Sequence, residues 1–220
     1  MKQASANLRI TIAIVMLLLI TACSQAITGP AVETVGEQNV TITPVVLFEG
    51  DERKYEPFFG YMTGAVTIDY TGNKRIMELG SEIWRDGKKV EELGGSAIFF
   101  DEEQLKDGYR GELIINMKER MMKDKKSELD IMMSMNANTG SNTMSYSMPW
   151  DPAFSGKSII VHNDSVNYTA DQAVPIWGIQ ATSNGEIQPT DFTPEYLART
   201  EYALIFTVRF LDQSEFDSSQ

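Results

Sequence analysis

The chain has 220 residues, of which 31 are Asp or Glu and 19 are Lys or Arg, so its formal net charge is −12. This acidity argues against a nucleic-acid-binding protein and against tight adhesion to anionic lipid headgroups. The single cysteine, Cys23, excludes disulfides within the chain, and the single histidine, His162, leaves little for nucleophilic catalysis.

The N-terminus has the pattern of a secretion signal. Lys2 and Arg9 precede an apolar run at 10–20, which is shorter than the roughly 20 residues of a membrane-spanning helix. The run ends in Ile20-Thr21-Ala22-Cys23, which resembles the lipobox of bacterial lipoproteins. The resemblance implies that a diacylglyceryl group is attached to the sulfur of Cys23 and that a peptidase cuts before this residue. The alternative is an ordinary secretory signal with an incidental cysteine.

Lipidation predicts the location of the protein. Each buried methylene of a lipid chain contributes about 0.8 kcal/mol, so two or more chains hold a protein stably at a membrane. Removal of residues 1–22, which carry two basic and no acidic side chains, leaves 198 residues with a net charge of −14. We expect a lipid anchor in the cell membrane and a chain that faces outside the cytoplasm. The lack of disulfides favours a Gram-positive surface over a Gram-negative outer membrane.

The chain divides into four segments by composition. We expect a signal peptide at 1–22, the lipidated cysteine and a flexible tether at 23–40, one β-domain at 41–211, and a disordered polar tail at 212–220. The tether prediction rests on small and polar residues interrupted by Gly29, Pro30 and Gly36.

Period-two alternation from residue 40 onward predicts strands. One strand covers 65–70 and another about 75–85, and Asp86-Gly87 then predicts a hairpin turn into a short strand at 88–90. Strands near 109–117, 128–137 and 144–148 follow one another as an antiparallel meander. The most apolar segment, 202–211, is expected to be a central strand.

Two short helices interrupt this pattern. Asp101 is expected to cap a helix at 101–108, and Thr193 is expected to cap a helix with Pro194 at its first position. The uneven strand lengths and varied connections favour a sandwich over a barrel. The sequence therefore predicts an all-β fold, an antiparallel β-sandwich that is immunoglobulin-like in broad architecture, with one or two short helices.

Methionine is concentrated in the predicted meander, where eight of the twelve lie between Met117 and Met148. Thioethers bind Cu(I), so one hypothesis is a copper site formed by Met121, Met122, Met132 and Met135. The first alternative is core packing, because most of these residues have the inward phase of their strands. The second is an adaptable surface for a partner protein.

No stretch of the sequence carries a catalytic motif. A Gly-x-Ser-x-Gly elbow is absent, and no cofactor or resident metal is expected. The leading hypothesis is a non-catalytic lipoprotein that binds a protein partner or another envelope ligand. The alternatives are Cu(I) binding and a carbohydrate-active or glycan-binding surface protein, in which loop aromatics such as Trp150 and Tyr168 stack on sugar rings. The residues that bind the ligand are not predicted.

Overall fold

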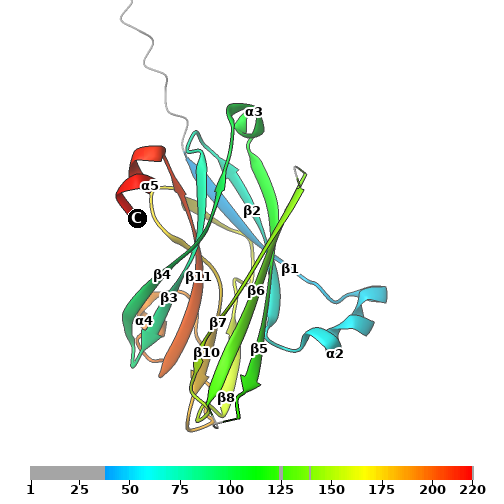
Figure 1. Ribbon diagram of the computed structural model, residues 1–220, viewed down its shortest axis with the longest axis vertical. Coiled ribbons are helices and arrows are strands. Elements are labelled where there is room, and N and C mark those ends of the chain that lie inside the picture. The colour runs from blue at the N-terminus through cyan, green and yellow to red at the C-terminus, as the bar shows by residue number, and fades with distance from the viewer. Residues whose placement is uncertain (1–37, 124–125, 139, 220) are drawn as a thin grey trace, which may run out of the picture. The chain divides into compact units, whose positions relative to one another are not determined.

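The computed structural model describes residues 38–123, 126–138 and 140–219. These residues form two antiparallel sheets, and the all-β sandwich expected from the sequence is confirmed. The six-stranded sheet has the order β7-β6-β5-β2-β1-β9 (Figure 1). Its strands are β1 (Asn39–Val45), β2 (Thr63–Thr71), β5 (Tyr109–Met121), β6 (Ser127–Ala137), β7 (Gly140–Trp150) and β9 (Val166–Thr169).

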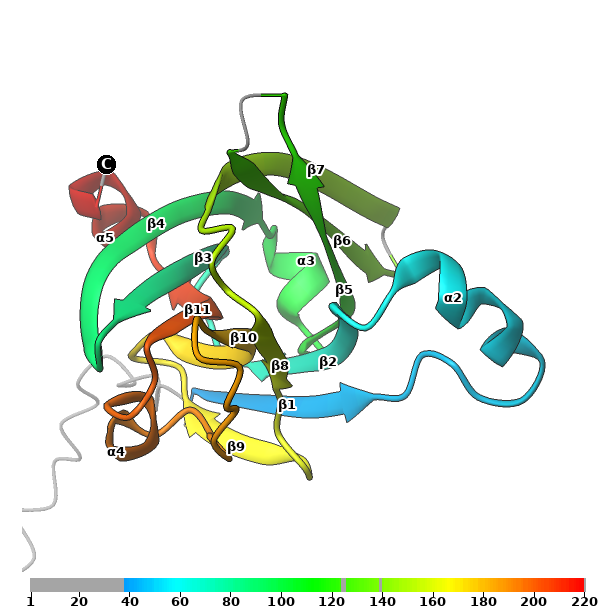
Figure 2. The same ribbon diagram turned by 90° about the horizontal axis from the view of Figure 1, so that it is seen from below.

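The five-stranded sheet has the order β4-β3-β11-β10-β8 and faces the first sheet (Figure 2). Its strands are β3 (Ile76–Arg85), β4 (Lys88–Phe99), β8 (Gly156–Ile160), β10 (Val174–Thr182) and β11 (Tyr202–Leu211). The described part of the chain has more strands than the seven or nine of immunoglobulin domains, so the likeness to those domains is one of architecture.

The core lies between the two sheets and is filled by the alternate, inward side chains of both. The rings of Tyr70 on β2 and Phe210 on β11 stack across it with centroids 3.7 Å apart. Strand β11 pairs with both β3 and β10. All of its residues except Arg209 are buried, which confirms the expected central strand.

The strand and turn predictions are confirmed in their main features. Strands β5, β6 and β7 form the expected meander by consecutive pairing. Asp86 and Gly87 have φ angles of 48° and 72°, as a two-residue hairpin turn with two left-handed positions requires. Strand β4 continues to Phe99, well beyond the predicted end at residue 90. Backbone pairing with β3 extends it although its exposed side chains do not alternate. One register shift accommodates Gly94 and Gly95, and a second accommodates Val90.

Five short helices are found among the described residues. They are η1 (Gly50–Tyr55), α2 (Glu56–Phe59), α3 (Glu102–Leu105), α4 (Pro194–Leu197) and α5 (Gln213–Ser219). The Asp101 cap is confirmed, since Asp101 Oδ1 accepts a bond from the Gln104 amide at 2.8 Å and Gln104 Oε1 accepts from the Asp101 amide. Within the described ranges, no helix is long and apolar enough to cross a membrane.

The prediction of a disordered tail at 212–220 is wrong for most of its length, because 213–219 form α5. Lys74 makes an ion pair of 3.0 Å with Glu215 of this helix. Phe216 packs its ring edge-to-face against Phe99, with centroids 5.5 Å apart. These contacts with β4 and the β2–β3 turn hold a polar segment that composition alone does not favour. The predicted signal, Cys23 and nearly all of the tether lie outside the described residues.

Candidate functional site

The outer face of the five-stranded sheet has an unusual composition for a surface. Side chains of β3 alternate, so Glu82 and Trp84 point away from the core. On the neighbouring central strand β11, the outward residues are Ile205, Thr207 and Arg209. A tryptophan at a solvent-facing strand position can be recognised in the sequence, and here it indicates that this surface is a candidate binding site.

A second, smaller apolar cluster forms on this face. It consists of buried Ile160, Leu197, Ala203 and Ile205, with Trp84 and Phe192 packed against it. Leu197 belongs to α4, so the cluster attaches α4 and the segment before it to the outside of the sheet. Helix α4 therefore forms one wall of a groove on the outside of the sheet and does not contribute to the core between the sheets.

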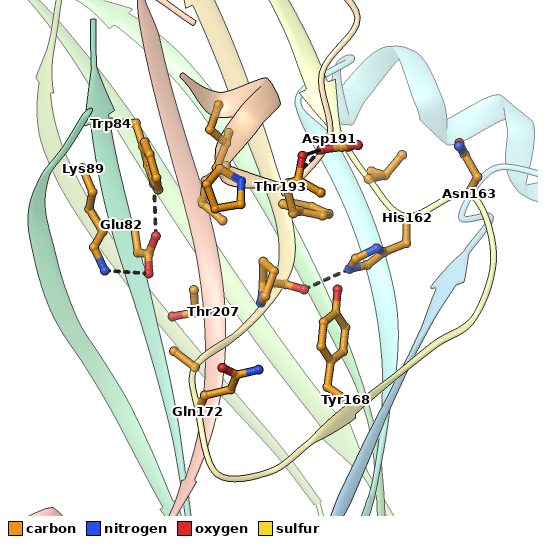
Figure 3. Close-up of a pocket in the computed structure, with 17 residues that line it drawn as sticks. Glu82, Trp84, Lys89, His162, Asn163, Tyr168, Gln172, Asp191, Thr193 and Thr207 are labelled. Carbon is orange, nitrogen blue, oxygen red and sulfur yellow. Dashed lines mark hydrogen bonds and ion pairs between the residues drawn. The ribbon is translucent and has the colours of Figure 1, made fainter. Parts of the chain in front are cut away.

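The groove has a volume of about 660 Å³, within the range of about 300–1,000 Å³ typical of small-molecule sites. Its floor is the outer face of β3 and β11, and its walls are the 161–175 segment and residues 191–197 (Figure 3). Aromatic side chains from separate parts of the chain line it: Trp84, His162, Tyr168 and Phe192.

His162 connects the aromatic side chains of the two walls. Its ring centroid lies 4.5 Å from that of Phe192 and 5.9 Å from that of Tyr168. Its Nε2 lies 2.9 Å from the carbonyl oxygen of Pro175. A carbonyl can only accept, so Nε2 carries the proton and His162 is a fixed part of the wall.

A network of charges lies on the floor of the groove, at the end of β3 and the start of β4. Trp84 Nε1 donates to Glu82 Oε2 at 3.0 Å, and Lys89 lies 3.3 Å from the other oxygen, Oε1 (Figure 3). Lys89 also bonds Glu92. The bond to Glu92, with the nearby charge of Glu82, raises the pKa of Lys89, and the same bond lowers the pKa of Glu92. The positive charge of the Lys89 ammonium is therefore balanced by carboxylates of the protein itself.

The segment before α4 is shaped by Asp191. Its Oδ1 accepts bonds from the backbone amide of Thr193 at 2.7 Å and from the Thr193 hydroxyl at 2.6 Å. Thr193 occupies the N-cap position and Pro194 the first helical position, as expected, but the Thr193 side chain makes no capping hydrogen bond because it bonds Asp191 instead. Burial, together with the charge of Asp191, raises the pKa of Tyr168.

Several neutral polar groups of the groove are not used by the protein itself. Within the part of the chain that the structure describes, no hydrogen bond involves the amides of Asn163 and Gln172 or the hydroxyls of Tyr168 and Thr207. These groups are free to donate to or accept from a ligand.

A second hollow of about 190 Å³ extends the groove along β3 and β11. It shares Glu82, Ala173 and Thr207 with the first. At its far side Arg209 makes an ion pair of 2.6 Å with Glu78. Between them lies Gly80, where a side chain would come within 3.2–3.3 Å of Leu93 and Thr207. The two hollows together follow β3 and β11 from Trp84 to Arg209.

The structure does not bring the four proposed copper ligands together. Met121, Met122 and Met132 are exposed, whereas Met135 is buried in the core. Met122 accepts a contact from the guanidinium of Arg120 at 3.0 Å. Met117, Met133 and Met148 are also buried, as the core-packing alternative expects.

The two aromatic residues proposed to stack on sugars have different positions. Trp150 is 4% exposed at the end of β7 and packs against Phe154 and Tyr202, so it cannot meet a ligand. Tyr168, on β9, lines the groove. Sequence reasoning missed Trp84 and Phe192, because only the fold brings β3 beside the residues before α4.

One further exposed surface lies on the β1–β2 connection. Helix α2 stands away from both sheets, and Val46, Tyr55, Phe58, Phe59 and Tyr61 are exposed around it (Figures 1 and 2). Asn116 fixes its base by donating to the carbonyl of Phe59 at 2.9 Å. Nothing in the structure shows what covers these side chains.

No cluster of three or more His, Cys, Asp or Glu suited to a metal ion occurs among the described residues. No protein-family model matches the chain, and neither the curated proteins nor the solved structures give a significant match.

Proposed function

We propose that the chain is a lipid-anchored, non-catalytic binding protein of the extracytoplasmic envelope, and that its ligand lies in the groove on the five-stranded sheet. The lipobox-like tetrad ending at Cys23 supports the anchor. The groove supports the binding function: it combines four aromatic side chains with unused polar groups, the composition typical of ligand sites. This groove is the single observation on which the proposed binding function depends.

The engagement of the groove's ionisable groups supports a binding function over catalysis. Both oxygens of Glu82 are occupied, one by Trp84 and one by Lys89. His162 Nε2 is committed to the Pro175 carbonyl, and Asp191 Oδ1 already accepts two bonds. A general acid or base needs a group within reach of the substrate, and Glu82 would have to break a contact to the protein before it could act as one.

Metabolic labelling with a palmitate analogue tests the anchor. We expect label on the wild-type chain and on the control variant Ser24→Ala, and none on Cys23→Ala. A wild-type chain without label, or a labelled Cys23→Ala chain, would contradict the anchor.

A substitution that fills the groove tests the binding site. Thr207→Trp places a large side chain on its floor, and Ser145→Trp places the same side chain on the exposed face of β7. With a benzophenone side chain at Asn163 of the groove, which on irradiation inserts into C–H bonds of a protein or a sugar, we expect adducts in intact cells of the otherwise wild-type chain and of Ser145→Trp but not of Thr207→Trp. Gln172→Trp fills the groove from its exposed rim, where a large side chain does not threaten folding, and should also abolish the adducts. Unchanged adducts with both groove variants would refute the groove as the site.

A further inference from the structure

We infer that the groove binds a linear, uncharged oligosaccharide. This inference rests on the proposed binding function and names the ligand class of that same site. Three features of the groove carry it: flat aromatic faces, unused neutral hydrogen-bonding groups, and cations that are already paired.

The aromatic side chains suit the faces of sugar rings. A pyranose has an apolar face of C–H groups, which packs against the face of an aromatic ring. Trp84 on one side and Tyr168 on the other present such rings to one groove (Figure 3). Phe192 also lines this groove. The bond from Nε1 to Glu82 limits rotation of the Trp84 indole, so its orientation is set before a ligand arrives.

The unused polar groups suit sugar hydroxyls. An amide both donates and accepts, and so does a hydroxyl, which matches a ligand whose groups also do both. The amides of Asn163 and Gln172 and the hydroxyl of Thr207 are of this kind, and none has a hydrogen bond within the described residues.

The charges of the groove disfavour an anionic ligand. Among the described residues, Lys89 and Arg209 are the cations of the two hollows, and each faces a carboxylate of Glu82, Glu92 or Glu78. A phosphate or carboxylate ligand would have to displace these partners. Asp191 adds a further negative charge at the rim. Together these observations favour an uncharged ligand.

A peptide fits the groove less well. Extended peptides bind most often by adding a strand to an open sheet edge. The floor here consists of β3 and β11, and both have paired neighbours on each side. Their backbone groups are therefore unavailable to a peptide, and recognition falls to side chains alone.

The length of the groove favours a chain of sugars over a single one. The second hollow continues the first past Glu82 and Thr207 toward Arg209. Gly80 leaves this passage open, since any side chain there would crowd Thr207. A linear oligosaccharide can occupy both hollows.

Trp84 provides a built-in reporter for a test. The chain has three tryptophans, and Trp150 and Trp177 are only 4% and 1% exposed. A ligand in the groove therefore changes the emission of Trp84 alone. The full chain should be purified in a polyoxyethylene detergent, because glycoside detergents would offer their own sugar headgroups. The probes are chitotetraose, cellotetraose and maltotetraose, with tetra-alanine as the peptide comparison.

We expect a saturable change of Trp84 emission with at least one tetrasaccharide and none with tetra-alanine. In calorimetry with that sugar, Gln172→Ala should raise Kd about tenfold, which corresponds to about 1.4 kcal/mol. Phe58→Ala, an exposed aromatic on α2, should leave Kd unchanged. Gln172 is exposed and makes no hydrogen bond among the described residues, so this variant does not threaten folding.

Two outcomes would overturn the inference. One is no saturable change with any tetrasaccharide at millimolar concentration, and the other is binding of tetra-alanine in their place. If either occurs while Thr207→Trp still abolishes the cross-linked adducts in cells, the sugar assignment fails and the groove remains the binding site. If Thr207→Trp also has no effect, the proposed function fails with it.

Discussion

The indole Nε1 of Trp84 lies 3.0 Å from Oε2 of Glu82, two residues earlier on the outward face of β3. Lys89, on the other side of the hairpin turn, lies 3.3 Å from the second oxygen of the same carboxylate. The tight turn at Asp86-Gly87 brings these groups together. One hairpin thus sets the position of the aromatic side chain on which the proposed function depends.

Removal of the hydroxyl should change the free energy of unfolding differently at two buried tyrosines. The hydroxyl of Tyr202 finds no hydrogen-bond partner among the described residues, whereas that of Tyr70 accepts a bond from the Lys74 amide at 2.9 Å. An unmade buried bond costs about 1–3 kcal/mol and a made one stabilises by about 1 kcal/mol. We expect Tyr202→Phe to leave stability unchanged or raise it, and Tyr70→Phe to lower it by about 1 kcal/mol.

Denaturant unfolding of the two variants measures this difference. Each is the other's control, because both remove one oxygen from a buried ring. Equal losses of stability in both would show that the Tyr202 hydroxyl is satisfied in solution.

Gly64 leaves the space that Trp177 fills across the sandwich. A Cβ at this position would lie 2.0 Å from Nε1 of the buried Trp177. Overpacking of this kind costs about 1–3 kcal/mol. We expect Gly64→Ala to lower the free energy of unfolding by that amount. Gly94→Ala, where a Cβ meets nothing within 4 Å, is the matched control. A Gly64→Ala protein as stable as the control would contradict the packing described here.

Stability should fall at alkaline pH because of Tyr109 and Tyr202. Burial raises the pKa of each to about 12. The usual pKa is about 10, so the unfolded chain loses these protons first as pH rises. The stabilisation is fully present below pH about 10 and is lost between about 10 and 12, by roughly 2–3 kcal/mol for each tyrosine.

Unfolding measured across this pH range checks the prediction. Tyr109→Phe should make the decline of stability with pH less steep, since one of the two tyrosines with the largest rise in pKa is gone. Stability that declines equally steeply in the variant would contradict the assignment to these residues.

The main architecture was predictable because strand alternation and turn chemistry are local. The sequence 109–148 predicts its meander, and Asp86-Gly87 its hairpin. The groove was not predictable, because it depends on contacts between distant segments. Trp84 and Phe192 line the same groove only because β11 lies between β3 and β10 in the sheet. Trp150 was misjudged because the turn pattern around Pro149 gives no indication that Phe154 and Tyr202 bury its ring.

Cu(I) should find no strong site among the methionines. Met121 pairs with Ser127, and Met132 lies five residues further along β6, about 17 Å away at about 3.4 Å per residue. Met135 is buried in the core. We expect a titration under reducing conditions to give no affinity tighter than micromolar, with Met132→Leu unchanged. A tighter site that Met132→Leu removes would contradict the placement of these side chains.

The most direct test of the central claim is site-specific photo-cross-linking in intact cells. A benzophenone side chain placed at Gln172 lies at the groove, and one placed at Met132 lies on the outer face of the six-stranded sheet. If the groove holds the envelope ligand, irradiation should give an adduct of higher mass from position 172 and none from position 132. An adduct from position 132 alone, or none from position 172, would contradict the account.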